Sequence, residues 1–286
     1  MLPFSIKKEG YELSKFDDIF VNMCEDILEN GYMNESDDTR AHWEDGTPAH
    51  TIKNSCVVNR YDLSIEAPVM TLRPVPLKSC VTELLWIWQK KSNKLSELDS
   101  KIWDSWRQDD GTIGTAYGYQ LNKKYIFPEG EMDQVDNVLY NLKHHPNSRR
   151  ILTSMYNFED LHSMALYPCA YSMTFNVKGN KLNAILNQRS QDILTANAWN
   201  VLQYACLVYM FAHVSNLEPG ELVHVIADAH IYDRHIPLVK ELIQRKTYPA
   251  PKLEINHHDN FYDYRPEDFK LINYEKNEQM KIEVAV

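Results

Sequence analysis

The chain has 286 residues, of which 44% are hydrophobic, and its formal net charge is −10 at pH 7. This length and apolar content suffice for a large buried core and indicate a soluble globular protein. The negative charge argues against a broad duplex-binding surface, so nucleic acid is excluded as an expected partner.

Sequence features also predict where the protein works. The N-terminal segment lacks the apolar core of a signal peptide, and the most apolar stretch, residues 204–214, is too short to span a bilayer and contains His213. We therefore expect a cytoplasmic protein without a membrane partner. Its five cysteines form no C-x-x-C pair, so neither a disulfide framework nor a zinc knuckle is indicated, and no metal is expected.

The first predicted elements are a helix, a loop and a strand. Apolar residues at helical spacing predict a helix from about Ser14 to Asn30, which Gly31 ends. A loop rich in turn-forming residues follows and carries Arg40. A strand is expected around residues 55–61.

Two further helices are predicted downstream. Ser79 is a candidate N-cap for the first, whose apolar stripe also holds Glu83. The second spans about Met132 to His145 and ends before Pro146, which precedes Arg149 and Arg150. On spacing alone, Glu83 is a solvated glutamate and the two arginines are a solvated charge pair.

The clearest strand follows Cys169, because apolar and polar residues alternate from Tyr171 to Val177 and again after the turn at residues 178–181. Pairing Val177 with Leu182 in a hairpin puts both apolar sets on one side. Extended along the strands, this register places Cys169 opposite Ser190, with Gln188 on the same face. Arg189 then points to the other face, unless a bulge turns it inward.

Two interpretations of Cys169 are open on this pattern. Lone cysteines commonly pack as small buried hydrophobes. A nearby guanidinium lowers the pKa of a thiol, however, and Arg189 is the local candidate for activating Cys169 as a nucleophile.

Ordered motifs resolve this choice by resemblance. The sequence is similar to the thymidylate synthase family from Arg40 to Val286, on the motifs TELLWIWQ (82–89), IWDSW (102–106), AYGYQL (116–121), PNSRR (146–150), MAL-PC (164–169), QRS-D (188–192), Asn200, D-HIY--H (228–235) and EVAV (283–286). The resemblance implies an α/β (α+β) fold in one domain, residues 1–286. Its large mixed sheet, surrounded by helices, would pack against its symmetry mate in a homodimer.

The resemblance also implies a reaction and its catalytic residues. Cys169 would attack C6 of dUMP, and C5 would then take the one-carbon unit of 5,10-methylenetetrahydrofolate, the co-substrate. Glu83 would run a proton relay around O4 of the base, and Tyr117 would assist proton removal at C5. Asn200 would read the base, and Asp192 would contact the folate.

The binding residues follow from the same matches. Those implied to hold the nucleotide are Arg40, Arg189, Ser190, Gln188, Asn200, His230 and Tyr232, joined by Arg149 and Arg150 from the second subunit. Those implied to hold the folate are Trp103, Asp192, Thr195, Leu166 and Ala285. Without the family, Trp103 is a core aromatic, Tyr117 a packing residue and Asp192 a turn residue. His224, Asp228, His230 and His235 do not match a common zinc spacing.

Departures from the family pattern bear on the product. Where the family carries leucine-glycine-any-proline-phenylalanine-asparagine, this chain reads Thr195-Ala196-Asn197-Ala198-Trp199-Asn200. The Thr195 hydroxyl could hold a water near the methylene on C5, which favours a dUMP hydroxymethylase of the kind that DNA-modifying phages carry into an infected cell. A thymidylate synthase is the alternative, and the retained tail at residues 284–286 favours it. A catalytically silent nucleotide-binding homologue is the third hypothesis.

Overall fold

The computed structural model describes residues 13–36 and 38–286. Its main sheet has seven strands: β1 (Tyr32–Asn34), β2 (Thr51–Asp62), β9 (Glu218–Tyr232), β7 (Lys181–Gln188), β6 (Ala170–Lys178) and β5 (Leu152–Ser154) in that order, with β8 (Gln191–Asp192) paired to β9. β9 runs parallel to β7 and β8, and the other neighbours are antiparallel. The mixed sheet expected from the sequence is confirmed.

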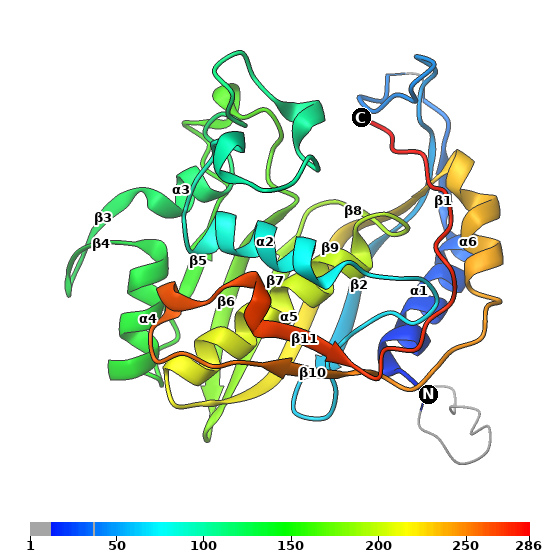
Figure 1. Cartoon of the computed structure of the whole chain (residues 1–286). Helices are drawn as coiled ribbons and strands as arrows, with labels where there is room; N and C mark the ends of the chain where they lie inside the picture. Colours follow the sequence, from blue (N-terminus) through cyan, green and yellow to red (C-terminus); the bar gives the residue numbers. More distant parts are fainter. Residues whose placement is uncertain (1–12, 37) are drawn as a thin grey trace.

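Helices cover one face of this sheet (Figure 1). The central helix α5 (Asn197–Val214) is apolar nearly all round and is buried between the sheet and α2 (Leu77–Trp88), while α1 (Lys15–Asn30) packs on β2. The remaining helices are α3 (Gly118–Asn122), α4 (Gln134–His144) and α6 (Ile236–Leu242). Two hairpins, β3 (Lys124–Phe127) with β4 (Gly130–Asp133) and β10 (Lys252–Ile255) with β11 (Phe269–Ile272), complete the sheets.

The opposite face of the sheet stays uncovered within the described residues. Ile185 aligns with Val223 on one side and Thr174 on the other, so these residues share one face of the pleat. Leu152 and Val58 lie on the same face, and they are 48% and 52% exposed. Exposed apolar side chains thus lie on a sheet face that also carries Asn183 and Asn187.

The predicted helices are observed, with one error at a boundary. Ser14 caps α1 by accepting a hydrogen bond from the backbone N–H of Asp17, and the helix ends at Gly31. The N-cap prediction for Ser79 is wrong: α2 begins at Leu77, directly after Pro76, and Ser79 lies in its first turn. Pro76 occupies the N-cap position, and among the described residues no side-chain hydrogen bond caps this helix. A proline has no N–H, so it leaves no donor unsatisfied there.

The hairpin register is confirmed at Val177 with Leu182 and at Met173 with Leu186, but it shifts by one residue between Ala170 and Ser172. The pairing of Cys169 with Ser190 is therefore wrong. A bulge at Tyr171 brings Arg189 opposite Cys169, and the backbone N–H of Arg189 donates to the Cys169 carbonyl at 2.9 Å.

Within the described residues no helix is long and apolar enough to cross a bilayer.

Candidate active site

Cys169 lies at the start of β6, in reach of a guanidinium. Arg189 Nη2 is 3.8 Å from Cys169 Sγ, and the same side chain donates to the carbonyls of Pro168 at 3.1 Å and Tyr167 at 2.7 Å. These three contacts hold the guanidinium on residues 164–169, which are called the cysteine loop below. The bulge thus turns Arg189 toward the thiol, as activation of a nucleophile requires.

The pKa of the Cys169 thiol reflects two opposed effects. Burial raises it, while the positive charges of Arg189 and Arg40 and a hydrogen bond with Tyr117 lower it. Burial is the larger effect, so the pKa lies above its ordinary value and the thiol is protonated near pH 7. The positive charge of Arg189, which the sequence pointed to as the activating group, is not enough by itself to ionise the Cys169 thiol.

Tyr117 reaches the cysteine from a strained turn. Its φ of 46° and ψ of −106° are costly for a residue with a side chain. The Tyr117 hydroxyl accepts a hydrogen bond from the Cys169 backbone N–H at 3.0 Å, and its ring packs on Trp103 with 5.2 Å between centroids. Burial raises the pKa of Tyr117 well above its ordinary value, so the side chain is a neutral phenol.

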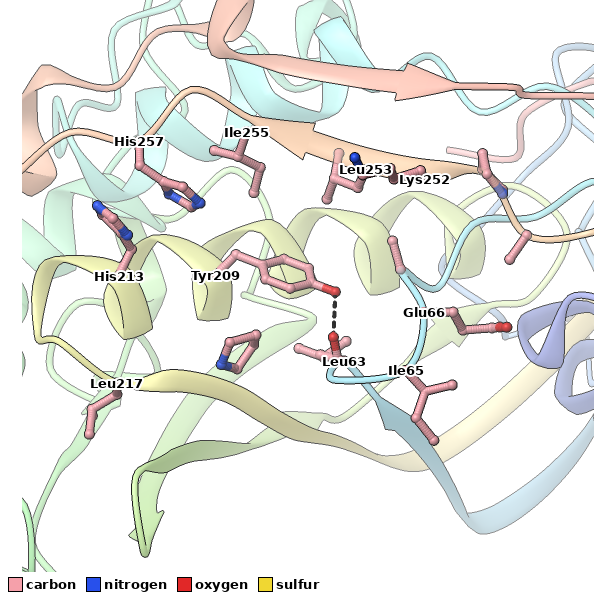
Figure 2. A pocket seen from close by; sticks show the side chains of 14 residues that line it. Leu63, Ile65, Glu66, Tyr209, His213, Leu217, Lys252, Leu253, Ile255 and His257 are labelled. Carbon is pink, nitrogen blue, oxygen red and sulfur yellow. Dashed lines mark hydrogen bonds between the residues drawn. The ribbon is translucent and has the colours of Figure 1, made fainter.

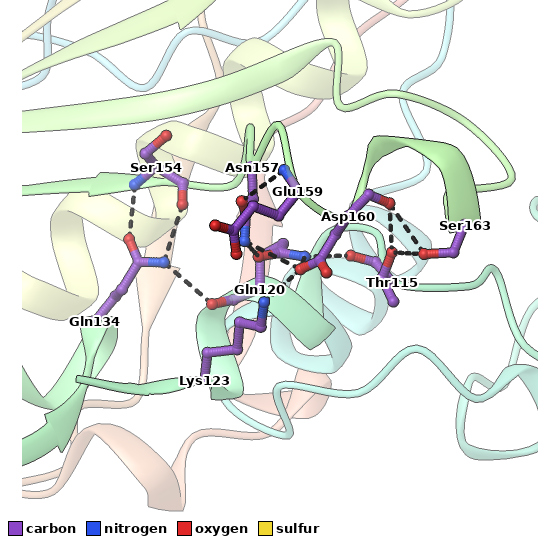
Figure 3. Close-up of polar contacts among 9 residues, drawn as sticks. All are labelled: Thr115, Gln120, Lys123, Gln134, Ser154, Asn157, Glu159, Asp160 and Ser163. Atoms are coloured by element: carbon purple, nitrogen blue, oxygen red, sulfur yellow. Dashed lines mark hydrogen bonds and ion pairs between the residues drawn. The ribbon is translucent and has the colours of Figure 1, made fainter.

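A polar network joins the Tyr117 turn to the loop that precedes Cys169 (Figure 3). Asp160 accepts hydrogen bonds from Gln120 Nε2 at 2.7 Å and Asn157 Nδ2 at 3.0 Å, and it pairs with Lys123. Thr115 Oγ1 donates to the Asp160 carbonyl at 2.9 Å. Since Gln120 and Lys123 follow Tyr117 closely, the network holds both sides of the site in one arrangement.

Glu83 is buried on α2 and accepts three hydrogen bonds. Trp103 Nε1 donates to Oε1 at 2.6 Å, whereas Trp199 Nε1 and Gln203 Nε2 donate to Oε2 at 2.6 and 2.7 Å. Burial raises the pKa of Glu83 above its ordinary value, and the three donors oppose that rise without cancelling it. Glu83 is not the solvated glutamate that spacing alone suggested, and its environment suits proton exchange.

A chain of amides connects the end of β7 with α5. Gln188 Nε2 donates to Asn200 Oδ1 at 3.2 Å and to the Ser190 carbonyl at 3.2 Å, and Gln191 Nε2 also reaches Asn200 Oδ1, at 3.4 Å. Gln188 Oε1 is 2.8 Å from Nε2 of His224, whose pKa burial lowers to about 3. Asn200 is thus oriented by neutral partners.

His230 and Tyr232 end strand β9 side by side, with 5.1 Å between ring centroids. His230 Nδ1 lies 2.8 Å from Asp228 Oδ1, and Lys53 Nζ lies 2.8 Å from Asp228 Oδ2. Burial raises the pKa of Asp228, but His230 and Lys53 outweigh it and hold the pKa below its ordinary value.

Within the part of the chain that is described, no three His, Cys, Asp or Glu side chains could hold a metal ion together.

Asp192 organises the turn before α5. Its Oδ1 accepts from the backbone N–H groups of Leu194 at 3.0 Å and Thr195 at 3.1 Å, and its Oδ2 accepts from Thr195 Oγ1 at 2.5 Å. His235 Nδ1 lies 3.9 Å from Oδ1. The single proton of the Thr195 hydroxyl is therefore used within the protein.

The C-terminal tail docks on the loop that carries Arg40. The backbones of His42 and Val286 exchange two hydrogen bonds, of 2.8 and 3.0 Å, and Ala285 packs on a small cluster that includes Trp43. Arg40 acts on Cys169 through its charge. Leu166, on the cysteine loop, packs against the main core.

Two of the residues implied by the resemblance stand apart from this group. Arg149 and Arg150 are exposed between α4 and β5, and neither side chain has an ion pair or hydrogen bond to a described residue of the chain. They cannot be placed at the site by contacts within one subunit. The proposal that they act across a dimer interface is compatible with this exposure.

Sequence reasoning missed four side chains that hold the others. Trp199 and Gln203 bind Glu83, while Lys53 and Asp228 support His230. Trp199 and Gln203 lie one helical turn apart, so both belong to one face of α5. That spacing was a usable signal, but their acceptor on α2 is more than 100 residues away in sequence.

A separate cavity lies on the far part of α5. It measures about 510 Å³ and opens between α5, β10 and the turn after β2 (Figure 2). His213 and His257 stack at one end of it, with 3.9 Å between ring centroids. It shares no lining residue with the group around Cys169, so it is a different feature of the molecule.

Comparisons with known proteins agree with one another. The family model described as thymidylate synthase matches residues 18–286. Thymidylate synthases of Bacillus mojavensis and Bacillus phage phi3T are each 44% identical to this chain over 280 residues, which is 96% of this chain and all of theirs. The structure of thermostable thymidylate synthase A from Bacillus subtilis matches with a TM-score of 0.90 at 42% identity, covering 95% of this chain and 99% of that one.

Proposed function

The chain belongs to the thymidylate synthase family, and on this premise we propose that it converts dUMP and 5,10-methylenetetrahydrofolate to dTMP and dihydrofolate. The observation that carries the proposal is the position of Cys169 beside both Arg189 and Tyr117. Cys169 would bond to C6 of the uracil ring, which makes C5 the nucleophile toward the one-carbon unit. The proton that leaves C5 would pass toward Tyr117.

Because burial keeps the Cys169 thiol protonated in the ligand-free protein, we propose that the thiol loses its proton as it adds to C6. Arg189 and Arg40 are the cations whose charges act on the sulfur, and they are also two of the residues proposed to bind the nucleotide phosphate. Forked guanidiniums suit a phosphate dianion. We propose that Ser190 completes this phosphate site and that His230 and Tyr232 bind the sugar hydroxyl.

Glu83 and Asn200 are proposed to act on the base. Asn200 has both an amide donor and a carbonyl acceptor, which matches O4 and N3–H of uracil. Burial raises the pKa of Glu83 and its three donors limit that rise, so this carboxyl suits proton exchange near O4. Gln188, which binds Asn200, would hold its amide in the orientation that reads uracil.

The residues implied to hold the folate suit it chemically. Trp103 offers an aromatic ring, Asp192 a carboxylate acceptor, and Leu166 and Ala285 apolar contact, which together match a ring system with amide and amine edges. When bound, the folate supplies the one-carbon unit and the hydride. The protein's own part is to orient it and exclude water, for which the docked tail is suited.

The hydroxymethylase that the sequence analysis favoured has less support than the synthase. That prediction needed the Thr195 hydroxyl to hold a reactive water, but Thr195 donates its proton to Asp192. The tail that would exclude water is docked on the Arg40 loop. The relatives compared above are named thymidylate synthases, including the one from a phage.

We further propose a symmetric homodimer in which Arg149 and Arg150 reach the phosphate of the neighbouring subunit. The exposed Ile185, Leu152 and Val58 on the uncovered face of the main sheet support this, since exposed apolar side chains on one face commonly form subunit interfaces. A single domain and a cytoplasmic location remain predictions from the sequence.

One experiment separates the three candidate functions. The protein is incubated with C5-tritiated dUMP and the folate, and tritium release, dihydrofolate absorbance and nucleotide mass are followed together. A synthase releases tritium and yields dTMP with dihydrofolate. Release with a hydroxymethylated nucleotide and tetrahydrofolate would instead establish the hydroxymethylase, and no release would leave only binding. The Cys169→Ala variant is the negative control.

A further inference from the structure

Glu83 is held by one donor that the family pattern does not provide. In the family pattern given above, phenylalanine stands where this chain has Trp199. A phenylalanine ring has no N–H to donate. In this chain Trp199 Nε1 donates to Glu83 Oε2 at 2.6 Å. The departure therefore changes the hydrogen bonding of the carboxylate proposed to run the proton relay.

The three donors are divided unequally between the two carboxylate oxygens. A carboxylate oxygen accepts about two hydrogen bonds. Oε2 accepts from both Trp199 and Gln203, whereas, among the residues that the structure describes, Oε1 accepts from Trp103 alone. Only Oε1 keeps an accepting position for a proton. The N–H groups of the three donors cannot accept a hydrogen bond, so none of them can take the proton from Glu83.

The other titratable groups near Glu83 in residues 13–36 and 38–286 do not supply a competing cation. Cys80 lies on the same helix, Tyr117 precedes α3 and Tyr204 lies on α5. Burial raises the pKa of each of these three groups, so each is neutral near pH 7. Burial therefore raises the pKa of Glu83, and the hydrogen bonds from neutral donors limit that rise.

We propose that Trp199 is a positioning residue that stabilises ionised Glu83 and confines its proton exchange to Oε1. The inference rests on the proposed function, in which Glu83 exchanges the proton, and deepens it by naming a residue that tunes this step. Trp199 lies in the first turn of α5, four residues after Thr195. The altered run before and into α5 therefore supplies donors to both carboxylates of the site, Glu83 and Asp192.

The test is the Trp199→Phe variant, which restores the residue of the family pattern and removes only the donor. The chain has six tryptophans, so its indole N–H signals can be followed singly by nuclear magnetic resonance in the ligand-free protein. In the wild type, the indole signals of Trp103 and Trp199 titrate together with Glu83. In Trp199→Phe the midpoint reported by Trp103 rises by about one pH unit, since one hydrogen bond to a charged group has been lost.

Two control variants make the result decisive. Trp86→Phe removes a buried indole that donates to the Lys94 carbonyl at 3.1 Å, and it should leave the Trp103 midpoint unchanged. Glu83→Gln should abolish both titrations, which tests the coupling even if Trp199→Phe folds poorly. An unchanged Trp103 midpoint in Trp199→Phe, an equal shift in Trp86→Phe, or a wild-type Trp199 signal that does not titrate would overturn the proposal.

A kinetic measurement links the coupling to turnover. In Trp199→Phe, the limb of the kcat/KM profile that reports Glu83 should move to higher pH by the same amount as the resonance midpoint. A wild-type protein that shows the resonance titration but forms no dTMP would refute the proposed function while supporting the Trp199–Glu83 coupling. The two failures are thus distinguishable.

Discussion

At Cys169, burial and charge act in opposite directions on the same thiol. Burial dominates in the ligand-free protein, and the guanidinium of Arg189, 3.8 Å from the sulfur, limits the rise in pKa. The side chain also binds two carbonyls of the cysteine loop. Arg189 therefore has an electrostatic role and a structural role, which different substitutions can separate.

Replacing Arg189 by glutamine should raise the pKa of Cys169 further, by about one unit, because a cation that favours the thiolate is lost. The pH dependence of iodoacetamide alkylation at Cys169 measures this shift as a midpoint that moves upward, read from the mass of the Cys169 peptide because Cys56 is also an exposed free thiol. Arg189→Lys keeps the charge but loses the forked contacts, so its midpoint should stay close to wild type. Equal shifts in both variants would show that loop structure, not charge, controls the thiol.

Among the elements, α1 is attached to the core through a buried carboxylate. Asp17 accepts hydrogen bonds from the backbone N–H of Thr71 at 2.9 Å and from its hydroxyl, and burial raises the pKa of Asp17 to about 6. A raised pKa means that the folded state binds the proton more tightly than the unfolded state. Its contribution to stability is complete below pH 4 and is lost as the pH rises through 6.

The Asp17→Asn variant should therefore gain stability relative to wild type between pH 4 and pH 7, by up to about 3 kcal/mol. Urea unfolding at the two pH values measures the difference. Asp110→Asn is the control: a hydrogen bond from Thr112 lowers the pKa of this exposed carboxylate, so the pH trend has the opposite sign. A difference independent of pH would contradict the assignment for Asp17.

The C-terminal tail is a second element with a defined attachment. Deleting Val286 removes both backbone hydrogen bonds to His42. At about 1 kcal/mol each, their loss should reduce the equilibrium constant for docking of the tail by roughly 30-fold. We expect kcat to fall by at least about tenfold while thiol alkylation by iodoacetamide stays normal. Val284→Ala, at an exposed position that keeps both bonds, should remain close to wild type; equal losses in both variants would contradict this role.

At the scale of the whole molecule, the proposed dimer makes each site depend on both chains. Cys169→Ala lacks the nucleophile, and a variant with both Arg149→Ala and Arg150→Ala lacks the donated cations. Mixed and reassembled, the two inactive variants should recover roughly a quarter of wild-type activity, because half of the dimers then hold one intact site. Activity is measured before and after reassembly.

The matched control mixes Cys169→Ala with Glu83→Gln. Both residues are proposed to act within their own subunit, so a mixed dimer then contains no intact site when Glu83 is essential. Recovery in the arginine mixture alone would support donation across the interface. Absence of recovery there, with mixed dimers present by mass, would show that these arginines act within one chain or not at all.

The sequence by itself determined the elements whose patterns are local. The alternation around Met173 predicted the hairpin, the spacing before Gly31 predicted α1, and the motifs predicted the family and the nucleophile. Periodicity reports which face of a single element is buried, and this information lies within a few residues.

Only the tertiary structure decided how these parts meet. One extra residue at Tyr171 replaced Ser190 with Arg189 opposite Cys169, and alternation cannot locate such a bulge. The donors of Glu83 come from separate segments, with Trp199 116 residues away along the chain. The ionisation of both Cys169 and Glu83 depends on burial, which exists only once distant elements pack together.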